Sequence, residues 1–128
     1  MKEKTICVLK VAPGEHPEPV TLVNELDSLQ EAVSIGAEAK GLIEVLNVEP
    51  GVCILCNEEG KLIGLEGNRR YGDDILTGVF YVLGSASDGE FASLPKDKMT
   101  KYASRFWEPE RFTEGEIDKA LVMRFFTL

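Results

Sequence analysis

Short apolar segments in the first half of the chain predict two β-hairpins. Residues 5–11 have apolar side chains at positions 6–9 and 11, on both faces of the predicted strand, which is typical of a strand with neighbours on both sides. Residues 20–23 follow a loop rich in proline and glycine and predict its hairpin partner. Residues 42–48 and 52–56 flank a Pro-Gly turn, so they predict a second hairpin.

The middle of the chain continues with apolar segments that alternate with polar turns. An acidic turn at 57–60 leads to a short apolar run at 61–63, which predicts a return strand and hence an antiparallel meander. Residues 64–74 are polar and contain glycine, so we expect an irregular connection there. Residues 75–83 predict a fifth strand, and residues 90–94 suit one more short strand.

Two segments have the spacing of amphipathic helices. Ser28 and Glu31 match a capping box, so we expect a helix near residues 28–35 that stops at Gly36. A second helix near residues 96–106 is predicted by apolar residues at i, i+3, i+4 and i+7. These apolar residues are Met99, Tyr102, Ala103 and Phe106.

The last segment of the chain is open to two interpretations. Thr113 and Glu116 form another capping-box match, and apolar residues continue after them at helical spacing. Residues 121–126 would equally suit a strand, because they are almost continuously apolar. We favour a helix start, with helix or strand left open for residues 113–127.

These elements predict an α+β fold, a mostly antiparallel sheet of about five strands covered by two or three helices. We expect residues 1–128 to form a single domain, with 107–128 the part that the pattern defines least. A chain of this length buries enough apolar surface to need no disulfide or metal.

The charge of the chain is negative and uneven. The net charge is −8, and residues 1–60 hold 4 Lys or Arg against 11 Asp or Glu, which is −7 of that total. An acidic first half disfavours direct binding of nucleic acid. Two interpretations stay open: a solvated surface, which we favour, and an acidic mimic of DNA that inhibits a DNA-binding enzyme, as antirestriction proteins do.

The cysteine pattern and the absence of secretory features predict a cytoplasmic protein. Three cysteines, an odd number, suggest free and buried thiols, and no apolar run is long enough to span a membrane. Cys53 and Cys56 form a C-x-x-C pair, but a separation of three within a strand places their side chains on opposite faces. We therefore expect Cys7, Cys53 and Cys56 to be reduced and structural, without a metal.

No segment carries a catalytic pattern, so the sequence gives no positive support for an enzyme or a cofactor. The adjacent carboxylates Glu58-Glu59 and Asp73-Asp74 lie in predicted turns, where such pairs usually solubilise the loop. His16 lies in the Pro-rich loop, and we expect it to be exposed. The glycines at 60, 64 and 67 do not form a nucleotide-binding loop.

The candidate ligand site is Asn68, Arg69, Arg70 and Tyr71. A guanidinium offers a planar fork of donors for phosphate or carboxylate, and a tyrosine ring can stack on a base. These properties predict a site for a nucleotide or another small anion. In the alternative, structural interpretation, Asn68 caps a turn and Arg69 pairs with an acidic side chain of the same chain. The acidic partners considered are Glu58, Glu59, Asp73 and Asp74.

Three motifs resemble a known family. They are C-N-E-E-G-K-L-x-G-L-x-x-N-R at residues 56–69, G-x-F-x-V-x-G at 78–84 and D-G-E-F-x-S-L at 88–94. This pattern is similar to a small uncharacterised family, a domain of unknown function, of phages and conjugative elements of Firmicutes, sometimes encoded near antirestriction genes. The resemblance covers about residues 5–106 and implies a mobile-element accessory protein without assigned catalytic residues.

The function that we expect is therefore binding rather than catalysis. Our first hypothesis is a non-enzymatic phage or mobile-element accessory protein that binds a host protein or a small ligand. The alternatives are an acidic DNA mimic and a nucleotide or small-anion site around Asn68-Arg69-Arg70. Direct binding of nucleic acid or membrane is not expected, and the oligomeric state is open.

Overall fold

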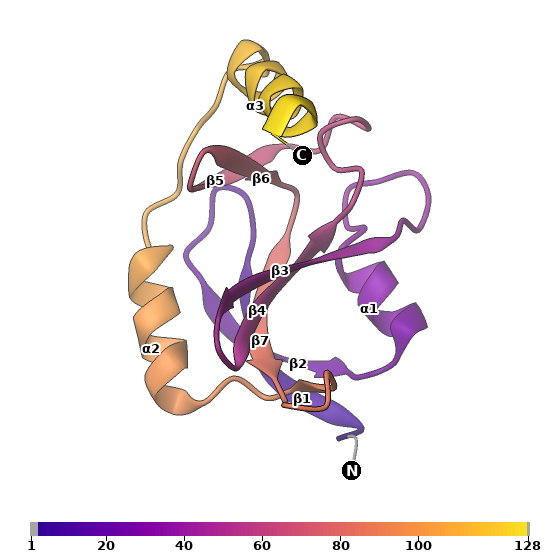
Figure 1. Cartoon of the computed structure of the whole chain (residues 1–128), viewed down its shortest axis with the longest axis vertical. Helices are drawn as coiled ribbons and strands as arrows, with labels where there is room; N and C mark the ends of the chain where they lie inside the picture. The colour runs from indigo at the N-terminus through magenta and orange to yellow at the C-terminus, as the bar shows by residue number, and fades with distance from the viewer. Residues whose placement is uncertain (1–2, 128) are drawn as a thin grey trace.

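A main antiparallel sheet with a helix on each face forms the centre of the molecule (Figure 1). The computed structural model describes residues 3–127, with side chains described for residues 3–123. The main sheet has the order β2-β1-β7-β4-β3, with β8 paired to β7, and β5 pairs with β6 in a second sheet. The strands of the main sheet are β1 (Thr5–Val11), β2 (Glu18–Val23), β3 (Ile43–Glu49), β4 (Val52–Asn57), β7 (Phe80–Ser85) and β8 (Phe91–Ala92). The remaining elements are β5 (Gly67–Tyr71), β6 (Asp74–Thr77), α1 (Leu26–Ala32), α2 (Lys96–Arg105) and α3 (Glu114–Thr127).

The predicted fold class is confirmed, whereas the predicted meander is wrong. All strand pairs of the main sheet are antiparallel, and both N-terminal hairpins form as the pattern predicts. The two hairpins do not follow one another across the sheet, because β7 lies between β1 and β4. Residues 80–84 of β7 are buried, and such a continuous apolar run suits a central strand.

Residues 61–63 do not form the predicted return strand. The Ile63 N–H donates to the Glu59 carbonyl (3.0 Å) and the Leu65 N–H to the Gly60 carbonyl (2.9 Å), so this segment is a series of turns. Leu62 and Ile63 are 64% and 48% exposed. The apolar run indicated a half-buried strand, but its side chains lie at the surface.

The boundaries between residues 64 and 85 also differ from the prediction. Part of the expected irregular connection, Gly67–Tyr71, is strand β5. The expected single strand 75–83 is divided into β6 and β7 at Gly78, whose φ of 72° lies in the left-handed region. The division lets β6 leave the main sheet and pair with β5 in a separate hairpin.

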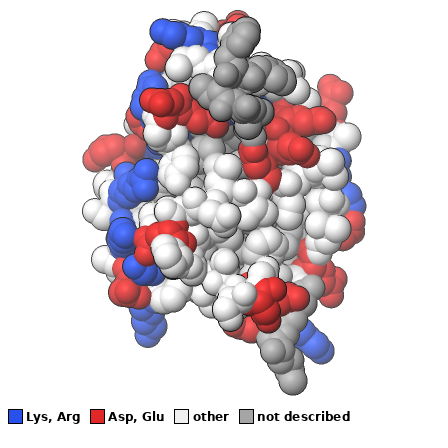
Figure 2. Space-filling view, viewed as in Figure 1, with Lys and Arg blue, Asp and Glu red and all other residues white. Residues whose placement is uncertain are grey.

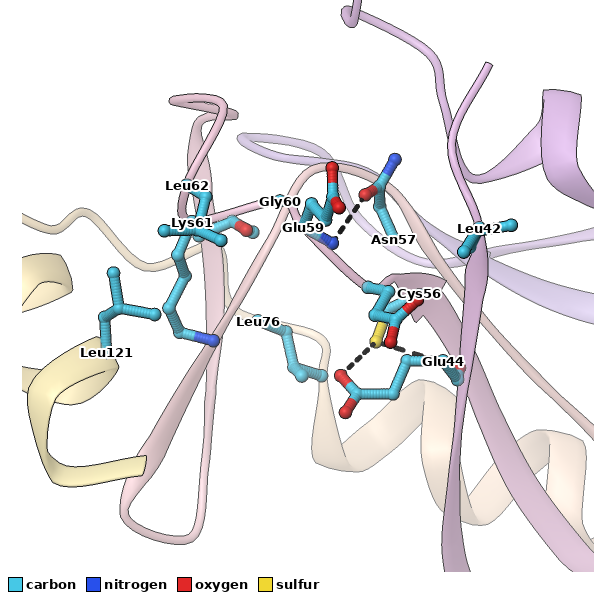
Figure 3. A pocket seen from close by; sticks show the side chains of 12 residues that line it. Leu42, Glu44, Cys56, Asn57, Glu59, Gly60, Lys61, Leu62, Leu76 and Leu121 are labelled. Atoms are coloured by element: carbon cyan, nitrogen blue, oxygen red, sulfur yellow. Dashed lines mark hydrogen bonds between the residues drawn. The ribbon is translucent and has the colours of Figure 1, made fainter. Parts of the chain in front are cut away.

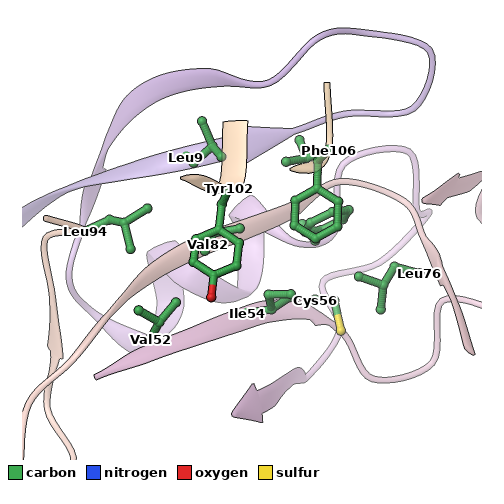
Figure 4. Packing of buried hydrophobic residues seen from close by; sticks show 11 residues of the cluster. Leu9, Val52, Ile54, Cys56, Leu76, Val82, Leu94, Tyr102 and Phe106 are labelled. Atoms are coloured by element: carbon green, nitrogen blue, oxygen red, sulfur yellow. The ribbon is translucent and has the colours of Figure 1, made fainter. Parts of the chain in front are cut away.

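Two apolar clusters lie on opposite faces of the main sheet. On the α2 face, Tyr102 and Phe106 pack over Leu9, Ile54 and Val82 (Figure 4). On the α1 face, the cluster contains Ile6, Val8, Leu29, Val33, Cys53, Leu55, Val79, Tyr81 and Leu83. The central strands therefore contribute apolar side chains to both faces, as their continuous apolar pattern predicts.

The cysteines follow the predicted alternation but differ in burial. Cys53 belongs to the α1-face cluster and Cys56 to the α2-face cluster, which confirms that they lie on opposite faces. All three thiols are free. Cys7 is exposed, so the expectation that it is buried is wrong.

Of the two predicted capping boxes, one forms. Helix α3 begins after Thr113, whose hydroxyl accepts from the Glu116 N–H (3.1 Å) while the Glu116 carboxylate accepts from the Thr113 N–H (3.1 Å). The favoured helical interpretation of the tail is thereby confirmed. Helix α1 instead begins at Leu26, without a side-chain cap at Glu25, so the predicted start at Ser28 is wrong.

Glu49 connects the end of β3 to α2. Its carboxylate lies 2.5 Å from the Lys98 Nζ and 2.7 Å from the Lys101 Nζ, and it accepts a hydrogen bond from the Tyr102 hydroxyl. The hydrogen bonds from Lys101, Lys98 and Tyr102 lower the pKa of Glu49 from its ordinary value of 4.5 to about 2. The ionised carboxylate therefore contributes to attachment of the helix.

We expect the thiols to differ sharply in reactivity. Burial raises the pKa of Cys53 to about 11 and that of Cys56 to about 12, so both stay protonated at pH 8. Iodoacetamide should modify only the exposed Cys7 in the native protein and all three cysteines after denaturation, as counted by mass spectrometry. Equal labelling of the three in the native protein would contradict the described burial.

We expect Glu49→Gln to remove a pH-dependent part of the stability. The folded pKa of Glu49 is depressed, so its stabilisation is fully present above pH 4.5 and is lost as the pH falls toward 2. The Tm of Glu49→Gln should lie below that of the wild type at pH 7, and the difference should shrink between pH 4.5 and pH 2. Glu38→Gln, at an exposed loop position, is the matched control and should leave the Tm unchanged.

Candidate functional site

A pocket of about 400 Å³ lies on the α2 face (Figure 3). One side is the open end of the β3–β4 hairpin, where β3 begins and β4 ends, and the other side is formed by β6 and α3. Its apolar lining includes Cys56 from β4, Leu76 from β6 and Leu121 from α3. The further lining residues are Leu42, Glu44, Asn57, Glu58, Glu59, Gly60, Lys61, Leu62 and Thr77. A volume of this size is in the usual range for a binding pocket.

The turn that follows β4 forms one rim of the pocket and is held closely against β6. The Asn57 side-chain oxygen accepts from the Glu59 N–H (2.9 Å). A Cβ at Gly60 would lie 2.4 Å from the Thr77 hydroxyl oxygen, so this close approach requires glycine. Glu58 and Glu59 are exposed beyond it, which gives this rim a negative charge.

Charged and sulfur groups of the pocket contact neighbouring side chains. The Lys61 Nζ lies 2.8 Å from an Asp74 carboxylate oxygen, and the Lys61 side chain is 8% exposed. The Cys56 Sγ lies 3.7 Å from a Glu44 carboxylate oxygen. Burial raises the pKa of this thiol to about 12, so it is not an activated nucleophile.

The outer side of β3 is an open edge of the main sheet, since among the described strands β3 pairs only with β4. The Glu58 N–H donates to the Leu42 carbonyl (3.0 Å), so the pair Leu42–Glu58 is hydrogen-bonded. Hydrogen-bonded and non-bonded pairs alternate in an antiparallel ladder. The N–H and C=O groups of residues 43, 45 and 47 therefore point away from β4, toward the open side.

The surface over this edge is mostly uncharged, although β3 contains Glu44, which lines the pocket, and Glu49, which faces α2. Figure 2 shows a continuous white area at the centre of the face where β3 lies nearest the viewer, with charged side chains around its margin. Leu42 and Val45 are exposed apolar residues there. Natural sheet edges usually carry Lys, Pro or inward-pointing charges that prevent pairing. The opposite edge, β2, has Glu18 and Pro19, whereas β3 contains neither Lys nor Pro and its two charges are Glu44 and Glu49.

The edge and the pocket are continuous with each other. Leu42 and Glu44 belong to the β3 side of the structure and also line the pocket. Glu44 pairs with Cys56 across the ladder, so its side chain lies on the same face as the pocket. A segment that extended the sheet beyond β3 would pass along the pocket.

A family comparison covers most of the chain. The family described as Domain of unknown function (DUF3846) matches residues 3–107. The chain belongs to this family. No curated protein and no solved structure matches the chain. The DUF3846 match includes the β3 edge and most of the pocket, and it ends before α3, which contributes Leu121 to the pocket.

The predicted ligand residues Asn68 and Arg69 lie inside the DUF3846 domain rather than at a surface. Asn68 donates to the carbonyls of Val11 and Gly78 (2.8 Å each). Arg69 is 1% exposed and donates to the Phe106 carbonyl from Nε (2.9 Å), to the Asn68 side-chain oxygen from Nη1 (2.7 Å) and to the Glu15 carbonyl from Nη2 (2.6 Å). Its hydrogen-bond partners are thus neutral oxygens, not the carboxylates of the structural alternative.

Arg70 and Tyr71 face different surroundings from Arg69. Arg70 is exposed, lies 3.6 Å from a Glu116 carboxylate oxygen and stacks its guanidinium over the Phe112 ring at 5.4 Å. Tyr71 is partly buried beneath the guanidinium of Arg105. The four residues do not converge on one cavity, and anion binding by them stays a prediction.

Other sequence candidates have clear positions. His16 is exposed, as predicted, and stacks on Trp107 with 4.2 Å between ring centroids. Within the part of the chain that the structure describes, no cluster of three or more His, Cys, Asp or Glu has the arrangement of a metal site. No described helix has the length and apolar character needed to cross a membrane.

Sequence reasoning located β3 but did not identify its edge as a site. The signal was present, because residues 43–49 contain five apolar or amide side chains and no lysine or proline. It is informative only once the strand is known to lie at an edge. That position depends on the pairing of β4 with β7, which the sequence pattern did not predict.

We expect Arg69→Met to lower the free energy of unfolding by about 3 kcal/mol or more, because it leaves several buried carbonyls without a donor. Arg69→Lys should recover only part of the loss, since an ammonium lacks the planar fork. Urea denaturation measures both, and Arg111→Met, at an exposed arginine, is the control. Retained stability together with lost binding of a small anion would instead support the ligand interpretation of Arg69.

Proposed function

We propose that this DUF3846 protein is a non-catalytic binding module that pairs the open edge of β3 with an extended segment of another polypeptide. The observation that carries the proposal is the open edge of β3, which has an exposed Val45 and no Lys or Pro, beside a partly apolar pocket. The outward N–H and C=O groups of residues 43, 45 and 47 would supply main-chain hydrogen bonds to such a segment.

The pocket would give this interaction its selectivity. Side chains of an added strand alternate between the two faces of a sheet, so every second residue would lie on the α2 face. A residue beside Glu44 would lie at the mouth of the pocket, near the apolar side chains of Leu42 and Leu76. Backbone pairing would thus provide affinity, and the pocket would select among side chains.

The biological setting of the proposal rests on the family resemblance. The motif at residues 56–69 is similar to domains of phages and conjugative elements, so we place the protein among mobile-element accessory proteins that act in the cytoplasm. In that setting the bound segment belongs either to a host protein or to another copy of the chain.

The two alternative functions have less support. A DNA mimic requires a continuous acidic face, whereas on the face in Figure 2 carboxylates alternate with lysines and arginines around an uncharged centre. A nucleotide site around residues 68–70 requires available donors, whereas the donors of Asn68 and Arg69 are directed at oxygens of the chain.

We expect Val45→Lys to abolish partner binding without unfolding the protein. Val45 is 43% exposed, so its replacement costs little packing, and a lysine on an edge strand opposes further strand pairing. Tagged wild type, Val45→Lys and Thr21→Lys would be compared by quantitative pull-down from a host lysate. Thr21→Lys places the same charge on the opposite edge, β2, and is the control.

A partner lost from Val45→Lys and retained by Thr21→Lys would support the β3 edge as the site. Equal capture by all three proteins would contradict the proposal. Circular dichroism of each variant verifies that the fold is retained.

A further inference from the structure

The polypeptide that fits the β3 edge best is a second copy of this chain. Building on the proposed function, we infer that two copies pair antiparallel through β3, so that the two main sheets become one continuous sheet and each copy completes the pocket of the other. A second copy presents the same strand edge. Under two-fold symmetry each copy then uses its β3 edge to bind the β3 edge of the other.

The register follows from the regular part of β3. The outward groups belong to residues 43, 45 and 47, and the β-bulge between Asn47 and Glu49 ends the regular ladder. All three residues pair only when Val45 lies opposite Val45 of the second copy, which places Ile43 opposite Asn47 of the second copy. A shift of one residue toward the start of β3 would place Glu44 against Glu44 of the second copy, and like charges directly opposite are unfavourable.

The same register brings apolar side chains of one copy to the pocket of the other. Residues directly opposite in a ladder project to the same face. Leu46 of the second copy therefore lies beside Glu44, on the α2 face that contains the pocket. Each pocket thereby gains an apolar side chain on the side where a single copy has only the open strand.

Charges at the two ends of the strand are complementary under this symmetry. The start of β3 lies beside the exposed Glu58 and Glu59, whereas its end lies beside Lys98 and Lys101, which share the single carboxylate of Glu49. Antiparallel pairing places the acidic end of one copy next to the lysine-bearing end of the other. The net charge of −8 on each chain opposes association, and so do the two Glu44 side chains, which are diagonal neighbours across the axis in this register. The Val45 pair on the axis itself is uncharged.

Sedimentation equilibrium of the wild type, Val45→Lys and Thr21→Lys tests the pairing. At concentrations from about 10 to about 200 µM, chosen to span ordinary dimer affinities, the mass of the wild type should rise toward twice the 14.1 kDa of one chain. Val45→Lys should associate at least about tenfold more weakly, because it places two lysines face to face at the axis. Thr21→Lys should behave as the wild type. A wild type that stays monomeric throughout this range overturns the inference.

Disulfide trapping tests the register itself. Opposed residues of a hydrogen-bonded pair have Cα atoms about 5.5 Å apart, within disulfide reach. In a Cys7→Ser background, Val45→Cys should therefore form a covalent dimer under oxidised glutathione. In the same register the two copies of residue 47 are about 14 Å apart, so Asn47→Cys should crosslink at least about tenfold more slowly. Equal crosslinking of the two variants overturns the register.

The outcomes separate this inference from the proposed function. A monomeric wild type whose partner capture is lost in Val45→Lys refutes the pairing of two copies but leaves strand binding at β3 in place. A dimeric Val45→Lys protein refutes the pairing through β3. Dimerisation of the wild type that Val45→Lys removes, together with the Val45→Cys crosslink, establishes the second copy as the occupant of the edge.

Discussion

The arrangement of the candidate site depends on one buried guanidinium. Arg69 extends from the β5–β6 hairpin and donates to main-chain carbonyls at the end of α2 and in the loop between β1 and β2. Asn68, beside it, connects the hairpin to the end of β1 and to the glycine that precedes β7. A charged group without water around it is costly unless its donors are satisfied, so these carbonyls must stay in place. The small hairpin is thereby fixed against the main sheet, and with it the Leu76 wall of the pocket.

The candidate site has one part inside the family match and one part beyond it. The β3 edge, the pocket residues other than Leu121 and the Arg69–Phe106 hydrogen bond all lie within residues 3–107. Helix α3 follows the matched region and adds Leu121 and the Glu116–Arg70 contact. The edge thus lies within the matched domain, whereas the part of the pocket lining that Leu121 contributes lies outside the match.

The sequence predicted local structure better than it predicted the arrangement of the strands. The two N-terminal hairpins, α2 and the alternation of Cys53 and Cys56 follow from spacing alone, and the structure contains them. The run at 61–63 was misread because an exposed Leu-Ile pair has the same pattern as a short strand. The strand break at Gly78 requires knowledge of a left-handed φ, which composition does not give. The role of Arg69 could not be predicted either, because its partners are carbonyls distant in sequence, which leave no trace in side-chain identity.

The central position of β7 has a consequence for how the chain folds. The β1–β2 and β3–β4 hairpins are local in sequence. In contrast, Val82 of β7 pairs with Leu9 of β1 on one side and with Ile54 of β4 on the other, and both partners are distant in sequence. Closing the long loops between β7 and its partner strands costs chain entropy before the strand contacts form. Folding also slows as the mean sequence separation of contacting residues rises. During synthesis both hairpins leave the ribosome with an unpaired inner edge, and they keep it until β7 has been made. The newly made chain is therefore exposed to wrong strand pairing for longer than a simple meander of the same length would be.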